Sequence, residues 1–309
     1  MIISNNKNLQ KEKSDINLKK SIQILEPKNI KKFALKDPEK ILYDNLYAKF
    51  GQRFVDYRKR YERNVQFKDL DEETDYPNTI IMELVNRCNL ECPFCKQWFR
   101  NDAKKTTIDD HILDHLFDDF KKNQLNSLMI SASEPLLYKK IDKVLERAKE
   151  AEIMDVFLFT NGILLNEKNA RMVLDSPITR LFISVDGATK ETYDKVRIPV
   201  AKRLLQTNRL QDLEDNILRF MKLRSELKRE LPLVRLSFVA INENKEEIQE
   251  FVNKWTGIVD TVEIQKNIAP SFEMNTKNEK ENIKDWYKTL GEEMNTENRI
   301  TDHLKKYSC

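Results

Sequence analysis

Short apolar runs alternate with longer amphipathic stretches from about residue 77 to residue 268. Runs of four to nine mostly apolar residues predict buried strands, and spacings of three or four predict helices between them. The predicted strands are 80–85, 127–133, 156–160, 180–186, 233–241 and 261–266, and the predicted helices are 108–122, 138–151, 167–174, 210–227 and 245–255. This alternation predicts an α/β fold of right-handed βαβ units with parallel strands. Six units fit either an open doubly wound sheet or a partial barrel, and the pattern alone does not choose.

The N-terminal part follows a different pattern. Residues 1–36 are polar and lysine-rich, which predicts a tail with a short ordered piece near residues 22–25. Asp37 and Pro38 suit a helix start, and apolar residues recur every three or four positions as far as Tyr61. We expect one helix that packs on the main domain, with partner binding as a secondary possibility.

The remaining segments suggest domain limits. An acidic connector at 69–78 precedes the first strand, and a polar stretch at 269–280 follows the last one. A further helix is predicted at 283–294. The predicted divisions are therefore a tail and helix over 1–76, an α/β domain over 77–270 and a C-terminal linker and helix over 271–309.

A cysteine cluster directly after the first predicted strand is the main chemical signal. The chain has four cysteines, and Cys88, Cys92 and Cys95 are three of them. Their spacing also fits a buried helical stripe, but Pro93 would break that helix, so a metal-binding loop is the better interpretation. Soft thiolates suit an iron–sulfur cluster or zinc.

Ligand counting separates these two metals. Closed zinc sites need four ligands, and no fourth Cys or His lies nearby, because His111 and His115 are interpreted as surface residues of a later helix. A four-iron cubane held by three thiolates keeps one iron open to a substrate or cofactor. The sequence therefore favours iron–sulfur, with zinc and a structural stripe as the alternatives.

Polar residues also follow the next three predicted strands. They are Ser131 to Pro135, Thr160-Asn161-Gly162 and Ser184 to Gly187. Each alone is ordinary turn chemistry, but parallel strands share one mouth at their carboxyl ends. We expect these groups to gather beside the cysteines.

Composition narrows the function classes. The chain is 40% hydrophobic and 34% charged with a net charge of +3, and its basic and acidic residues are interspersed. This charge distribution predicts no basic surface for binding nucleic acid, and no apolar run is long enough to span a membrane. A cytoplasmic protein with reduced cysteines is expected.

The C-x3-C-x2-C spacing after a strand, with Phe94 before the last cysteine, resembles the radical S-adenosylmethionine (SAM) enzymes. The resemblance implies a partial (β/α)6 barrel with an N-terminal helical extension. It also implies a [4Fe–4S] cluster on Cys88, Cys92 and Cys95, with SAM on the open iron. Such enzymes generate a 5′-deoxyadenosyl radical that abstracts hydrogen. The expected substrate is a peptide or a small metabolite, and the expected reductant is an electron donor such as a flavodoxin or ferredoxin.

The same resemblance implies the SAM-binding residues, which are Phe94, Ser133, Glu134, Thr160, Asn161, Ser184, Asp186 and Arg197. Arg197 is expected to pair with the SAM carboxylate, its alternative being a surface residue at a helix end. The family's Gly-Gly-Glu-Pro motif is replaced here by Ala132-Ser133-Glu134-Pro135. Two added Cβ atoms motivate an alternative function, a non-catalytic cluster- or SAM-binding module.

The segment from Glu191 to Arg197 resembles members of this family that carry a C-terminal SPASM or twitch domain. In such relatives an auxiliary-cluster domain opens with a cysteine, which Cys309 resembles. We therefore expect a fragment of a longer chain, the alternative being a complete chain with an incidental last cysteine.

Overall fold

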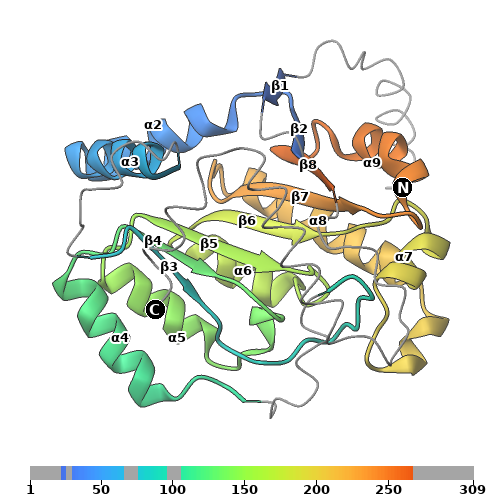
Figure 1. The fold of residues 1–309 in the computed structure, drawn as a ribbon, viewed down its shortest axis with the longest axis horizontal. Helices are drawn as coiled ribbons and strands as arrows, with labels where there is room; N and C mark the ends of the chain where they lie inside the picture. The colour runs from blue at the N-terminus through green and yellow to red at the C-terminus, as the bar shows by residue number, and fades with distance from the viewer. Residues whose placement is uncertain (1–21, 26–29, 66–75, 96–105, 267–309) are drawn as a thin grey trace, which may run out of the picture. The chain divides into compact units, whose positions relative to one another are not determined.

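The computed structural model describes residues 22–25, 30–65, 76–95 and 106–266. Its strands form one eight-stranded sheet in the order β1-β2-β8-β7-β6-β5-β4-β3 (Figure 1). The strands are β1 (Ile22–Leu25), β2 (Ile30–Ala34), β3 (Thr79–Met82), β4 (Ser127–Ile130), β5 (Asp155–Thr160), β6 (Ile178–Ser184), β7 (Leu233–Ala240) and β8 (Thr261–Lys266).

The order of the parallel strands decides between the two folds that the sequence allowed. Strands β3 to β8 pair parallel with their neighbours in chain order. A doubly wound sheet reverses its order at a switch point, and this sheet has none among its described strands. The predicted α/β fold, a partial (β/α)6 barrel, is therefore confirmed.

Among the described residues, six α-helices connect or follow the parallel strands, and most match the predicted stretches. They are α4 (Asp110–Lys122), α5 (Ile141–Glu150), α6 (Glu167–Asp175), α7 (Lys190–Val196), α8 (Arg209–Glu226) and α9 (Ile248–Trp255). The last predicted helix begins as a short 3-10 turn, η5 (Lys245–Glu247), before α9. Helix α7 was not predicted as a helix.

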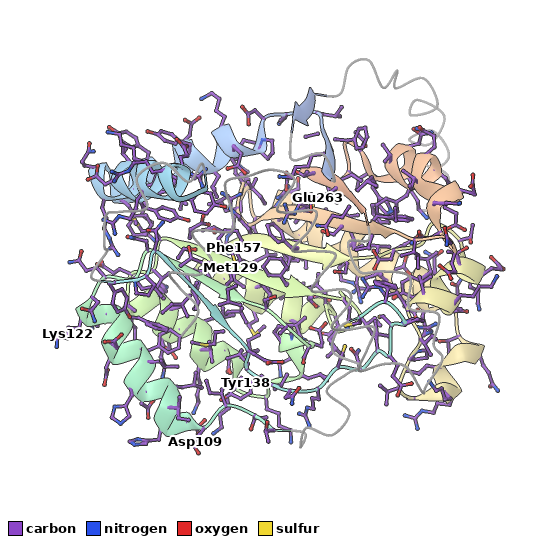
Figure 2. The ribbon with its side chains drawn as sticks, viewed as in Figure 1. Asp109, Lys122, Met129, Tyr138, Phe157 and Glu263 are labelled. Atoms are coloured by element: carbon purple, nitrogen blue, oxygen red, sulfur yellow. The ribbon has the colours of Figure 1, made fainter. Side chains whose placement is uncertain are left out.

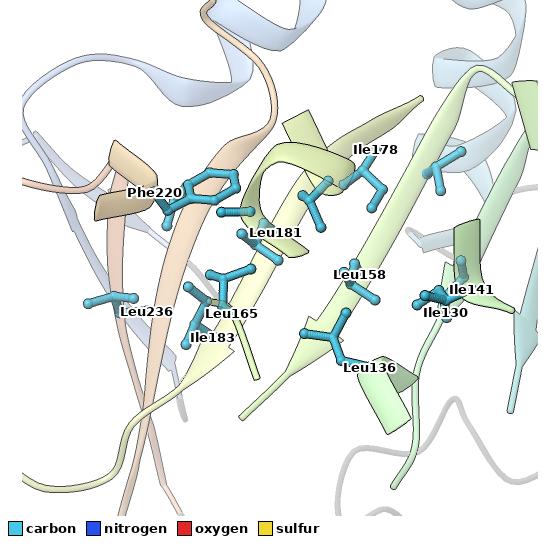
Figure 3. Close-up of a cluster of buried hydrophobic side chains, with 14 of the residues drawn as sticks. Ile130, Leu136, Ile141, Leu158, Leu165, Ile178, Leu181, Ile183, Phe220 and Leu236 are labelled. Carbon is cyan, nitrogen blue, oxygen red and sulfur yellow. The ribbon is translucent and has the colours of Figure 1, made fainter. Parts of the chain in front are cut away.

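The main core lies between the sheet and these helices. Leu158, Leu181 and Leu236 project from the strands toward Phe220 of α8 and neighbouring helical side chains (Figure 3). Burying each such side chain contributes about 2 kcal/mol relative to leaving it exposed. Met129 and Phe157, labelled in Figure 2, alternate with these core residues along β4 and β5 and line a hollow of about 420 Å³ on the other face of the sheet.

The prediction of a single N-terminal helix is wrong, because the structure has two helices in that region. Helix α2 (Pro38–Phe50) ends at Gly51, whose φ of 55° lies in the left-handed region that glycine accepts easily, and α3 (Gln52–Val65) follows. The predicted start is confirmed: the Asp37 carboxylate accepts hydrogen bonds from Glu39 N (3.0 Å) and Lys40 N (3.1 Å).

Helices α2 and α3 pack at the amino ends of the parallel strands, away from the cysteines. Their Leu42, Leu46, Phe54 and Tyr57 form a second core with residues beside β5 and in β7. The Tyr57 hydroxyl donates to Asp155 Oδ2 (3.2 Å). The predicted packing of this extension on the α/β domain is thus confirmed.

The predicted short ordered piece near residues 22–25 is confirmed as β1, but β2, which pairs antiparallel with it, was not predicted in the polar tail. Strand β2 also pairs antiparallel with β8, which extends the sheet. Lysines within β2 hid the strand, since Lys32 faces a carboxylate rather than apolar core: its Nζ lies 3.7 Å from Glu263. The predicted helix at 283–294 and Cys309 lie outside the described residues, and the predicted domain limits stay predictions.

Within the part of the chain that is described, no helix combines the length and the apolar character needed to cross a membrane.

Candidate active site

The three clustered cysteines lie in the loop that follows β3, at the carboxyl end of the parallel strands. Their thiols are free, with Cys92 buried and Cys88 and Cys95 half-buried. Leu90 N (3.4 Å) and Asn161 Nδ2 (3.7 Å) donate to Cys88 Sγ. Arg197 Nη1 lies 3.6 Å from Cys92 Sγ. Nitrogen donors from three parts of the chain thus surround two of the sulfurs.

The cysteine loop is held by a segment from the far side of the barrel mouth. Leu90 forms an antiparallel bridge with Pro199. Glu91 N donates to Ile198 O (2.7 Å), and Val200 N donates to Asn89 O (3.0 Å). These backbone bonds fix the loop that carries Cys88 and Cys92 without using their side chains.

Burial raises the pKa of the Cys88 thiol to about 11 and also raises the pKa of the Cys92 thiol. Both are therefore neutral thiols at pH 7 unless a cation replaces their protons, as metal binding does. Among the described residues, no three Cys, His, Asp or Glu side chains are grouped closely enough to hold a single metal ion.

Glu134 ties the ends of β4 and β5 together. Its fully buried carboxylate accepts hydrogen bonds from Thr160 Oγ1 (2.8 Å), Asn161 N (2.8 Å) and Leu136 N (3.1 Å). Burial raises the pKa of Glu134, although these three donors oppose that shift. The predicted residues Glu134, Thr160 and Asn161 therefore form one unit, which Asn161 connects to Cys88.

The two residues that replace the expected glycines have left-handed backbone conformations. Their φ angles are 67° at Ala132 and 48° at Ser133. This bend ends β4 at Ile130, before the predicted limit of 133. A residue with a Cβ atom is strained by about 1–2 kcal/mol in the left-handed conformation, which explains why glycine suits both positions. The Ser133 hydroxyl donates a hydrogen bond to Oε1 of Glu83 (3.0 Å), and Glu83 was not identified from the sequence.

A left-handed residue also ends β6 before the predicted limit, since Asp186 has a φ of 62°. Its buried carboxylate accepts a hydrogen bond from Val239 N (2.6 Å) and pairs with the Arg197 guanidinium. Burial alone would lower the pKa of Arg197, but Asp186 raises it above its ordinary value, so the guanidinium stays charged.

Arg197 is a buried residue rather than the surface residue of the alternative interpretation. Its guanidinium lies 5.6 Å from the centre of the Phe94 ring, close to Cys92 and Asp186. Its Nε is buried and has no hydrogen-bond partner among the described residues. Ser184, the remaining predicted residue, is half-buried at the end of β6.

Several residues that hold the predicted site residues in place were not identified from the sequence. Each is recognised only by a contact with a residue that, for most of them, is distant in the chain. Asn89 Oδ1 accepts from Asn161 Nδ2 (2.7 Å), and Asn244 Nδ2 donates to Asp186 O (3.0 Å). Glu247 accepts hydrogen bonds from Ala188 N (2.7 Å) and Thr189 Oγ1 (2.5 Å) at the start of α7. Only Asn89, directly after Cys88, lies close enough to the motif to be suspected from the sequence.

The residues present fit an iron–sulfur cluster with one open iron. Free thiols supply soft ligands, and N–H groups directed at bound sulfurs are the usual second layer of such sites. The unpartnered Arg197 Nε leaves a buried donor available for an anionic group. No residue among those described contradicts the fit.

Two curated proteins are similar to part of this chain. A probable GTP 3′,8-cyclase of Methanococcus maripaludis is 29% identical over 117 residues, which are 38% of this chain and 39% of that protein. An AdoMet-dependent heme synthase of Methanosarcina barkeri is 28% identical over 124 residues, 40% of this chain and 35% of that protein. The matched stretches thus span about two-fifths of these relatives' length.

Among solved structures, Streptococcus suis SuiB bound to S-adenosylmethionine aligns with a TM-score of 0.46 at 15% identity. The alignment covers 76% of this chain and 59% of SuiB.

The sequence profile of the radical SAM superfamily matches residues 82–254, which is more than half of the chain. The match begins at the end of β3 and ends in α9, so it includes the cysteine loop and the carboxyl ends of β4, β5 and β6. The cofactors of this superfamily are a [4Fe–4S] cluster and SAM, as the sequence predicted. The chain therefore belongs to the radical SAM superfamily.

Proposed function

We propose that this chain is the barrel of a radical SAM enzyme in which Cys88, Cys92 and Cys95 hold a [4Fe–4S] cluster. The observation that carries the proposal is the group of three free thiols at the barrel mouth, with nitrogen donors directed at two of the sulfurs. When bound, the cluster and SAM supply a 5′-deoxyadenosyl radical that abstracts hydrogen from the substrate.

The residues around the cysteines support that chemistry by position and charge. Asn161 and Leu90 stabilise the Cys88 thiolate through hydrogen bonds, and Arg197 places a fixed positive charge beside Cys92. Because Cys92 and Arg197 are buried, water has little access to this side of the site. Reactive radicals need such exclusion of solvent.

We propose that Arg197 binds the SAM carboxylate and that Asp186 orients it. The Asp186 carboxylate takes one arm of the guanidinium, while Nε stays available. Glu134 acts by positioning Thr160 and Asn161, since its oxygens already accept three hydrogen bonds. Phe94, Ser133 and Ser184 complete the proposed SAM site.

The proposed substrate is a peptide or a small metabolite. The relatives carry names as different as GTP 3′,8-cyclase and heme synthase, so the shared stretch does not select one substrate. We expect the electron to come from a flavodoxin or ferredoxin.

Anaerobic reconstitution with iron and sulfide tests the proposal. The wild-type protein should develop sulfur-to-iron charge-transfer absorbance and, with a strong reductant, release 5′-deoxyadenosine from SAM. Cys92→Ala should lose both properties, and Cys309→Ala, outside the motif, should keep both. A wild-type protein that takes up no iron would refute the proposal.

A second candidate function rests on Ala132 and Ser133, whose side chains stand at left-handed positions where the family carries glycine. A barrel that binds the cluster or SAM without turnover would fit this departure. Cluster formation without any release of 5′-deoxyadenosine under strong reductant would favour this candidate.

A further inference from the structure

Helix α4 carries two of the chain's three histidines on its solvent-facing side. His111 and His115 are four residues apart, and both residues are exposed. Asp109, which precedes the helix, is labelled in Figure 2. The buried side of α4 consists of Leu113, Phe117 and Phe120. The two histidines therefore belong neither to the core nor to the cysteine site.

The two imidazole rings face each other through their Nε2 atoms. These atoms are 3.1 Å apart, whereas the ring centres are 4.2 Å apart, and the ring planes are inclined by 68°. If only protons are present, one Nε2–H donates to the other Nε2, and a single lone pair is used. A hydrogen bond between exposed groups replaces bonds to water and contributes little stability. A metal ion between the rings would use both lone pairs.

The separation of the two nitrogens matches the spacing of two ligands on one metal ion. A histidine nitrogen lies about 2.0–2.1 Å from a bound zinc ion, so two nitrogens 3.1 Å apart subtend an angle of about 95–100° at the metal. This angle lies between the values for square-planar and tetrahedral coordination. Histidines four residues apart on one helix face are also the pair that helical zinc sites use. No third protein ligand is grouped with them among the described residues, which leaves the remaining positions to water.

The charges on α4 do not oppose a cation beside this pair. Asp118 is exposed one turn after His115 and forms no ion pair with another residue that the structure describes. Two cations from the α5 side are already neutralised, because Lys140 pairs with Asp110 and Arg147 pairs with Asp114. Carboxylates at the start of the helix also offset the positive end of the helix dipole, which would otherwise repel a metal ion.

We propose that His111 and His115 chelate one divalent transition-metal ion through their Nε2 atoms, with water in the remaining coordination positions. Imidazole suits zinc, copper, nickel and iron, whereas magnesium and calcium prefer oxygen ligands. Catalytic zinc helices with this histidine spacing carry a glutamate directly after the first histidine, and this chain has Ile112 there. The site therefore joins the first two turns of α4 and lacks that general base. It uses none of the cysteines and does not depend on the proposed function.

Calorimetric titration of the cluster-free protein with Ni²⁺ tests the proposal. Because the cysteines are the same in every histidine variant, the histidine site is the part of Ni²⁺ binding that His115→Gln removes. We expect one Ni²⁺ per chain at this site. We expect affinity to fall by at least about tenfold in His115→Gln and in His111→Gln, since each removes one of two nitrogen ligands.

A variant with the wrong spacing is the matched control. It combines His115→Gln with Ile112→His, and Ile112 is 51% exposed. This control keeps the number of histidines but sets them one residue apart, where side chains on a helix do not face each other. Its affinity for Ni²⁺ should therefore stay as low as that of His115→Gln.

Two further measurements separate chelation from independent histidines and from nonspecific charge. The variant that combines His111→Gln with His115→Gln should bind Ni²⁺ only slightly more weakly than either single variant, because one imidazole forms no chelate. Mg²⁺ should not bind at this site. Excess Ni²⁺ should raise the Tm of the wild type more than that of His115→Gln.

A wild type that binds Ni²⁺ no better than His115→Gln would overturn the proposal and leave a hydrogen-bonded pair of histidines. Wild-type affinity in the wrongly spaced control would overturn it as well. Neither result bears on the proposed function, which iron uptake by the cysteine loop tests separately.

Discussion

At the residue scale, the backbone at Ala132 and Ser133 shows what the replacement of the family's two glycines costs. Both residues have a positive φ, so the bend needs no glycine to form but is strained without it. Glu134 follows this bend and has its carboxylate hydrogen-bonded to β5. The sequence predicted which residues gather here, but not that Glu134 binds Thr160 and Asn161, because that contact spans 26 residues or more.

Ala132→Gly should stabilise the folded protein, because it removes left-handed strain. The strain costs about 1–2 kcal/mol, and the greater freedom of glycine in the unfolded chain returns about 0.4–1 kcal/mol of that. We expect a gain of up to about 1.5 kcal/mol in the free energy of unfolding by urea. Ala148→Gly within α5 is the control and should lose about 1 kcal/mol or more. A loss of similar size at Ala132 would contradict the account.

Glu134→Gln should destabilise the barrel mouth. A glutamine places an NH₂ group where one carboxylate oxygen now accepts from Asn161 N, so a buried donor loses its acceptor. The expected loss is about 2 kcal/mol in the free energy of unfolding, from the cost of an unsatisfied buried polar group. Thermal or urea unfolding measures it, with exposed Glu226→Gln as the control. Equal stability of the two variants would show that the Glu134 carboxylate is dispensable.

At the element scale, strand and helix periods predicted the repeating unit well. Strands β5 to β8 are continuous apolar or alternating runs, and each stands within two residues of its predicted limits. The errors have local causes: Gly51 divides the first helix, and Lys32 of β2 pairs with Glu263 of the neighbouring strand β8. The periodicity of apolar residues does not reveal a single glycine break or a single ion pair of this kind.

Helix α2 is attached to the sheet by an ion pair between Glu39 and Arg180, with Arg180 Nη1 2.7 Å from Glu39 Oε1. Burial raises the pKa of Glu39, but the charge and hydrogen bonds of Arg180 outweigh it, so the net pKa is below the ordinary 4.5. Stability from this pair is therefore present above about pH 4.5 and is lost as pH falls through the lowered pKa.

Glu39→Gln should consequently cost about 1 kcal/mol at pH 7 and much less at pH 3. Urea unfolding at both pH values measures the difference. Glu62→Gln in α3, at an exposed position, is the control variant at both pH values. If Glu39→Gln were as stable as the wild type at pH 7, the pair would not hold α2 on the sheet.

At the scale of the whole molecule, the two ends of the barrel have different roles. Helices α2 and α3 close the amino ends of the strands, while the carboxyl ends carry the cysteines, Glu134 and the Asp186–Arg197 pair. The cysteine motif and the strand alternation predicted the groups at the carboxyl ends, but not that the N-terminal helices would close the amino ends. A hollow of about 490 Å³ beside Cys88 was not predictable, because it is built from four separate segments of the chain.

Removal of the cluster should loosen the mouth of the barrel. Three buried or half-buried thiols are held there by one loop, so bound metal adds its binding free energy to the stability of the folded state. Differential scanning fluorimetry under anaerobic conditions should show a lower Tm after chelation of iron. Cys88→Ala should show no such dependence on chelation, and a wild-type Tm indifferent to iron would argue against a cluster in this loop.

The most direct test of the central claim is the electron paramagnetic resonance spectrum of the anaerobically reconstituted, dithionite-reduced protein with and without SAM. We predict the signal of a reduced [4Fe–4S] cluster, at about four iron per chain, whose shape changes when SAM binds at the open iron. A spectrum without a cluster signal, or a cluster signal that saturating SAM leaves unchanged, would contradict the account.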